Sequence, residues 1–270
     1  MYFFRFTFTT YLFFITISTY AQTVKNIDVK NIETVALDSR DNIHIVKANQ
    51  EIAEYSPDGN FVRSFIPENR NLASYLDVSN PFKLFFFFRD FQEILFTDRY
   101  YSKLSSIDLY QIGFENISCA SPSRNGDLWL LEEGINEVYR YSLLQHQKII
   151  NFSIKQHLSK TEYPNYIKEA NHYLAVSTNE SIHWLDQAGN EINLFEKPKG
   201  CIAEYVSDNL IWMATKDEFI QININSLKTK KTVKIQMPVE HLLYNSSNNK
   251  LLIFSKGNIH FYNAAELFQN

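Results

Sequence analysis

The sequence predicts an all-β fold, a six-bladed β-propeller in which an N-terminal strand completes the last blade. The chain has 270 residues, of which 45% are hydrophobic, and its 22 Phe and 16 Tyr occur in short apolar runs typical of strands. A similar pattern recurs about every 40 residues, which is the spacing of propeller blades. Six such units fill residues 22–270, so the chain is long enough for a complete ring.

The second strand of each unit is the most apolar and gives the repeat its register. These strands are NIHIVKA from Asn42, FKLFFFF from Phe82, GDLWLLE from Gly126, HYLAVST from His172, NLIWMAT from Asn209 and NKLLIFS from Asn249. A strand packed between two neighbouring blades is buried on both faces, so a continuous apolar run is expected there. The run from Leu84 to Phe88 therefore requires no ligand to explain it.

The other strands of each unit follow the same order. A first strand, such as ETVALDS or EHLLYN, precedes a polar turn and the second strand, and a third strand follows a short polar link. Fourth strands such as NFVRSFI and KTVKIQM close five units, but the sixth ends at Asn270 without one. The strand-like segment TVKNIDV, just after residue 22, is not assigned to any strand of the six units. We expect it to supply the missing strand, which joins the two chain ends and leaves no unpaired blade.

Residues 1–21 are typical of a secretory signal peptide. Arg5 precedes about a dozen mostly apolar residues, and small residues stand at Thr19 and Ala21, which predicts cleavage before Gln22. The apolar run is shorter than a membrane span, although an uncleaved anchor is the alternative. No Cys follows the cut, so the lipid-anchoring signal of a bacterial lipoprotein is missing. We therefore divide the chain into a signal peptide, 1–21, and one propeller domain, 22–270, with no transmembrane segment after cleavage.

The two cysteines, Cys119 and Cys201, lie 82 residues apart in apolar segments without metal-binding spacing. An exported protein can form disulfides, but the repeat assigns these residues to blades that are not neighbours. We expect two buried free thiols and no disulfide.

Two segments resemble known proteins. Residues 37–65, LDSRDNIHIVKANQEIAEYSPDGNFVRSF, resemble NHL-type propeller repeats, with a polar turn before the second strand and a Y-x-x-D-G-like turn after the third. Residues 77–99, DVSNPFKLFFFFRDFQEILFTDR, look like a family of exported, uncharacterised propeller-like proteins of Gram-negative bacteria. Units four to six lack the NHL turn. The resemblance implies a propeller fold and export, and it implies no catalytic residues.

Composition and motifs exclude several functions. The net charge of -4 gives no basic field for nucleic acid, and there is no G-x-S-x-G motif of a serine hydrolase. Sialidase propellers need an arginine clamp, but no Arg follows Arg140. The seven histidines are scattered, and His44, His183 and His260, inside strands, are interpreted as structural. We predict no cofactor and no metal site, with one alternative left open: a Ca²⁺-dependent hydrolase or lactonase that uses axial carboxylates.

One face of the predicted disc collects the longest connections. Residues 66–74, 110–117 and 154–166 each join a fourth strand to the next first strand, and charged links between second and third strands lie at the same end of the strands. Such turns can be charged simply because they are solvated. If this face binds a ligand, the candidate contacts are Arg70, Arg89, Asp90, Glu132, Glu133, His157, Tyr163, Lys216 and Asp217.

Together these patterns favour an exported, non-enzymatic binding or scaffold protein. The expected location is the periplasm or the outer membrane of a Gram-negative bacterium, or the outside of the cell. The expected partner is a protein of the cell envelope, for example an outer-membrane secretion machine. The Ca²⁺-dependent hydrolase remains the alternative.

Overall fold

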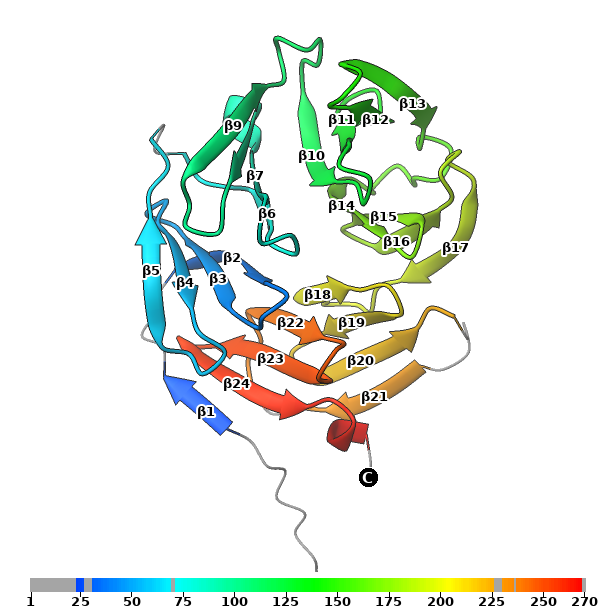
Figure 1. The fold of residues 1–270 in the computed structure, drawn as a ribbon. Helices are drawn as coiled ribbons and strands as arrows, with labels where there is room; N and C mark the ends of the chain where they lie inside the picture. The colour runs from blue at the N-terminus through cyan, green and yellow to red at the C-terminus, as the bar shows by residue number, and fades with distance from the viewer. Residues whose placement is uncertain (1–22, 27–30, 69–70, 226–229, 236, 269–270) are drawn as a thin grey trace, which may run out of the picture.

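Six four-stranded antiparallel sheets surround a central axis in the computed structural model, which describes residues 23–26, 31–68, 71–225, 230–235 and 237–268 (Figure 1). Within each sheet the strands follow one another from the axis outward. The predicted six-bladed β-propeller is confirmed, and each predicted second strand occupies the second position of its blade. The signal-peptide prediction falls on residues outside the described ranges.

The first three blades contain twelve strands: β2 (Ile32–Leu37), β3 (Ile43–Lys47), β4 (Ile52–Tyr55), β5 (Phe61–Phe65); β6 (Tyr75–Asp77), β7 (Leu84–Phe88), β8 (Glu93–Thr97), β9 (Lys103–Asp108); β10 (Ile117–Pro122), β11 (Leu128–Glu132), β12 (Glu137–Ser142), β13 (Gln147–Ser153). The last three contain β14 (Pro164–Ala170), β15 (Tyr173–Thr178), β16 (Ser181–Leu185), β17 (Glu191–Glu196); β18 (Ala203–Val206), β19 (Leu210–Ala214), β20 (Glu218–Asn223), β21 (Lys230–Lys234); β22 (His241–Asn245), β23 (Lys250–Ser255), β24 (Asn258–Asn263), β1 (Thr23–Asn26). Two short 3-10 helices are η1 (Arg89–Phe91) and η2 (Glu266–Phe268).

The ring closes as predicted, through the N-terminal strand. β1 pairs antiparallel with β24, with Thr23 opposite Phe261 and Asn26 opposite Asn258, and so becomes the fourth strand of the last blade. Figure 1 shows the blue β1 beside the red β24. This pairing covers the outer edge of β24 and links the start of the chain to its end.

The second strands are buried because each contacts two neighbouring blades. All five residues of β7 are buried, and successive side chains point to opposite faces of the sheet. Phe85 and Phe87 pack with the cluster that contains Leu128 of blade 3, whereas Phe86 and Phe88 pack with that of Val46 in blade 1. The continuous run of apolar residues is therefore a consequence of packing between blades.

Two of the first strands are shorter than the segments predicted for them, ASYLDVS (73–79) and CIAEYVS (201–207). β6 ends at Asp77 because the side chain of Asp77 accepts hydrogen bonds from the amide and hydroxyl of Ser79 and starts a turn. β18 begins at Ala203 rather than Cys201, since the Cys201 amide donates to the carbonyl of Pro198 in a turn. The described part of the chain contains no helix with the length and apolarity that a membrane crossing requires.

Candidate functional site

The connections at one end of the strands form a common surface, which we call the loop face. It consists of the links from second to third strands and the links from each fourth strand to the next blade. Hydrogen bonds join the two kinds of link: the Tyr163 amide donates to Asn179 Oδ1, and the Glu115 amide donates to Glu132 Oε1. The structure thus brings together the connections that the sequence assigned to one face.

Two of the charged candidates, Arg89 and Glu133, contact each other directly. Their side chains, each about half exposed, form an ion pair of 2.6 Å between the links of blades 2 and 3. Asp90 lies beside Arg89 in η1 and is exposed. Exposed ion pairs of this kind contribute little to stability, so these groups remain available to a partner at little cost to the fold.

The remaining candidates are spread more widely. Tyr163 is exposed on blade 4, and Lys216 and Asp217 form an exposed pair on blade 5, with 3.9 Å between Nζ and Oδ2. Arg70 lies outside the described residues. Arg89 and Asp90 lie on the link of blade 2 and Glu133 on that of blade 3, next to Glu132 at the end of β11, and the Arg89–Glu133 ion pair joins the two blades.

His157 faces inward instead of outward. One of its ring nitrogens, Nε2, lies 3.0 Å from the carbonyl oxygen of Gly189, and its ring centroid lies 6.4 Å from that of His183. It lines a small pocket of about 500 Å³ together with Glu162 and Ser181. His157 is therefore part of a polar network between blades 3 and 4.

That network centres on His183 of β16. Its Nδ1 lies 2.6 Å from Glu191, and its Nε2 lies 3.0 Å from the hydroxyl of Ser181 and 3.3 Å from Glu162. A serine beside a histidine and a carboxylate can suggest a nucleophile. Here, however, the Ser181 hydroxyl also donates to Glu162, a negative group where an oxyanion would need donors. The network therefore holds the 154–166 connection on blade 4.

The charge state of Glu162 follows from these contacts. Burial alone would raise the pKa of Glu162, but hydrogen bonds from Ser181, the Ser159 amide, Thr178 and His183 lower it to about 2. The carboxylate thus remains ionised at neutral pH. Sequence analysis missed this network because its members come from three different segments and match no known motif.

Apart from Tyr163, sequence analysis also missed the exposed apolar side chains of the loop face. Sixteen large hydrophobic residues are exposed in the described chain. Seven of them lie on loop-face connections: Ile66, Leu72, Phe91, Tyr110, Ile135, Tyr163 and Ile202. Phe91 and Ile135 follow the paired Arg89 and Glu133 by two residues each, so apolar and charged groups alternate across blades 2 and 3.

A central channel of about 1130 Å³ follows the axis and is lined largely by the first strands. Its wall contains seven acidic and four basic residues, and several are already paired. Lys197 contacts Glu204 at 2.5 Å, and Arg124 contacts Asp208. Cys201 lines this channel and is half-buried, unlike the predicted buried thiol, whereas Cys119 is buried; both are free.

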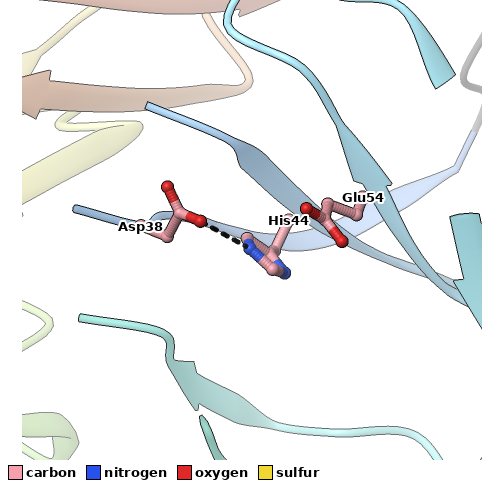
Figure 2. A group of neighbouring side chains, drawn as sticks. All are labelled: Asp38, His44 and Glu54. Carbon is pink, nitrogen blue, oxygen red and sulfur yellow. Dashed lines mark ion pairs between the residues drawn. The ribbon is translucent and has the colours of Figure 1, made fainter. Parts of the chain in front are cut away.

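The described residues contain one group of three metal-ligating types, Asp38, His44 and Glu54, and it lies in blade 1 away from the axis (Figure 2). Its members already have protein partners. His44 Nδ1 lies 2.8 Å from the hydroxyl of Tyr101, Asp38 accepts hydrogen bonds from Asn42, and Glu54 pairs with Arg63 at 2.9 Å. A histidine and a carboxylate neutralised by arginine do not fit Ca²⁺, which requires six or more oxygen ligands. We interpret the group as a structural contact that holds blade 1 against blade 2.

Comparisons with known proteins identify the fold. No family model matches the chain, and no curated protein matches it. The Cps50 (Swd1) β-propeller domain of Myceliophteria thermophila superposes with a TM-score of 0.64 at 6% identity, covering 89% of this chain and 99% of that chain. A streptogramin B lyase gives 0.61 at 11% identity, covering 89% and 97%. A catalytically inactive histidine-to-alanine variant of virginiamycin B lyase from Staphylococcus aureus, with quinupristin, gives 0.59 at 15%, covering 90% and 89%.

These similarities establish the β-propeller fold but neither a family nor a function, because all three sequence identities are below 25%. The similar structures include both enzymes and a domain that is not named as one. The fold is therefore compatible with a scaffold and with an enzyme, and function has to be argued from the sites of this chain.

Proposed function

We propose that the chain is an exported binding protein, without catalytic activity, that holds a protein partner of the cell envelope on its loop face. The single observation that supports this most is the group of apolar side chains exposed there. Phe91 is 57% exposed and Ile135 is 51% exposed, and they lie on the same two links as Arg89 and Glu133, which form an ion pair. Exposed apolar residues beside polar ones are typical of protein interaction surfaces.

Blades 2 and 3 also offer a rigid base for such a surface. Beneath the links, Gln92 donates through Nε2 to the carbonyl of Ile117 and accepts from the Ile117 amide through Oε1, at 2.9 and 2.6 Å. These two bonds fix the link of blade 2 to the first strand of blade 3. A surface that is held in place before binding loses less conformational entropy when the partner docks.

The location in the envelope is part of the proposal and rests on the signal-like residues 1–21. Mass spectrometry of the protein from its native envelope should find a mature N-terminus at Gln22. A protein that retains residues 1–21 in the cytoplasm would contradict export.

The binding role is tested with purified mature protein immobilised and incubated with an envelope extract of the source organism in mild detergent. We compare the parent, a Phe91→Asp/Ile135→Asp double variant, and Phe82→Asp as the matched control. Phe82 is 80% exposed but lies in the turn between β6 and β7, at the other end of the strands.

The proposal predicts an envelope protein that the parent and Phe82→Asp retain and the double variant does not. Two results would contradict it: no envelope protein above background, or equal retention by all three proteins. A melting temperature of the double variant close to that of the parent shows that loss of binding is not loss of folding.

A further inference from the structure

Three tyrosines project into the central channel from the first strands of three blades: Tyr75 of β6, Tyr166 of β14 and Tyr205 of β18. The rings of Tyr75 and Tyr166 are nearly parallel, with 16° between their planes and 6.5 Å between their centroids. Tyr205 is close enough to influence the ionisation of both. Aromatic groups from blades 2, 4 and 5 thus meet at the axis.

The hydroxyls of these tyrosines make no hydrogen bond to any other residue within the described ranges, and their side chains are partly open to the channel. Burial, followed by the negative charge of Asp77 and the neighbouring Tyr205, raises the pKa of Tyr75 well above its ordinary value; burial and Glu204 do the same for Tyr166. Both phenols therefore stay protonated at neutral pH. Each offers an apolar ring face together with a hydroxyl that can donate and accept.

Several of the charged groups around the tyrosines already have protein partners. Lys168 donates to the carbonyl of Val206 at 2.9 Å, and its Nζ lies 4.9 Å from the centre of the Tyr205 ring. Glu204 forms an ion pair with Lys197 and accepts a hydrogen bond from Ser177. Burial lowers the pKa of His241, which leaves that imidazole neutral. A charged ligand that used Lys168 or Glu204 would have to displace these partners. A neutral ligand would not.

From this arrangement we infer that the channel binds a neutral carbohydrate, a sugar ring or a short oligosaccharide. One face of a sugar ring presents C–H groups that stack on an aromatic ring, and its hydroxyls pair with polar groups such as free phenols. The three tyrosines supply both, and the channel volume of about 1130 Å³ is large enough for more than one sugar unit. The sugar site lies along the axis, so it is separate from the protein partner proposed above for the loop face.

Saturation-transfer NMR with a panel of neutral sugars tests this inference on the mature protein. The panel consists of glucose, galactose, N-acetylglucosamine, maltose, cellobiose and lactose, with sialic acid and tryptamine as charged probes. Four proteins are compared: the parent, Tyr166→Phe, Tyr166→Ala, and Tyr163→Ala as a control. Tyr163 is exposed on the loop face and lies outside the channel lining.

We expect at least one neutral sugar to receive saturation from the parent and from Tyr163→Ala. Tyr166→Ala should abolish the signal, and Tyr166→Phe should weaken binding about three- to tenfold, as expected for one lost hydrogen bond. Tyr166→Phe keeps the aromatic ring and its packing. Weaker binding by this variant therefore reports the lost hydroxyl, even if Tyr166→Ala fails to fold.

Three results would overturn the inference. They are the absence of transfer to every neutral sugar, transfer that persists unchanged in Tyr166→Ala, and transfer to sialic acid or tryptamine alone. Because the readout does not involve a protein partner, it is independent of the loop-face experiment.

Discussion

Adding one methyl group at Gly189 should destabilise the contact between blades 3 and 4. Gly189 lies in the turn between β16 and β17 with φ of 85°, where an L-residue pays about 1 kcal/mol or more. A Cβ at this position would also clash with three atoms of Phe152 of β13: Cδ2, Cγ at 2.5 Å and Cβ at 3.0 Å. Because Cβ and Cγ of Phe152 are among them, rotating the ring does not remove the clash, and the blades must shift.

The matched control is Gly126→Ala. Gly126 has φ of 84°, nearly the same backbone conformation, but nothing lies within 4 Å of its Cβ position. Gly126→Ala should therefore show the backbone cost alone. Gly189→Ala should show that cost plus about 2 kcal/mol from overpacking, which corresponds to a further decrease in melting temperature of about 4–8 °C for a protein of this size. Thermal and urea unfolding of the two variants measure the loss of stability that each substitution causes. Equal destabilisation by the two substitutions would refute the packing of Gly189 against Phe152.

Three other predictions concern closure, acid stability and calcium. Deleting Thr23–Asn26 should lower the melting temperature markedly, because β24 loses its outer partner; a deletion that melts like the parent would argue against closure by β1. The ionised Glu162, with a pKa lowered from 4.5 to about 2, stabilises the fold above pH 4.5 and loses this effect as the pH falls towards 2. Glu162→Gln should therefore lose less stability than the parent between pH 4.5 and 2, as measured by urea unfolding, and parallel pH curves would contradict this. Calcium at about 5 mM should leave the melting temperature unchanged; a rise would support a Ca²⁺-dependent enzyme.

The sequence predicted the fold because blade packing produces a local signal. A second strand buried on both faces must be apolar throughout, as Leu84–Phe88 is, and six such runs at nearly equal spacing define a ring. The missing fourth strand of the last unit and the unassigned strand after residue 22 likewise predicted the closure by β1. The apolar pattern of a second strand lies within one short segment, and the closure follows from counting the strands of each unit. Neither prediction required knowing which distant residues meet in space.

The candidate sites were less predictable because they combine residues from distant segments. Tyr75, Tyr166 and Tyr205 meet only because three first strands face the same axis, and tyrosine is common enough in this chain to hide the coincidence. His157 looked like an exposed loop residue, yet it turns inward to the carbonyl of Gly189. Phe91 and Ile135 lie in short links that the sequence marks only as polar and charged, so the apolar part of the loop face became evident only from their exposure in the structure.

Site-specific photo-crosslinking in living cells tests the loop-face proposal most directly. A photoreactive phenylalanine analogue is placed at position 91, at position 135 or, as the control, at position 82 on the opposite side of the disc. The proposal predicts a discrete crosslinked envelope protein from positions 91 and 135 and none from position 82. Crosslinks from position 82 alone, or none from any position, would contradict a binding role for the loop face.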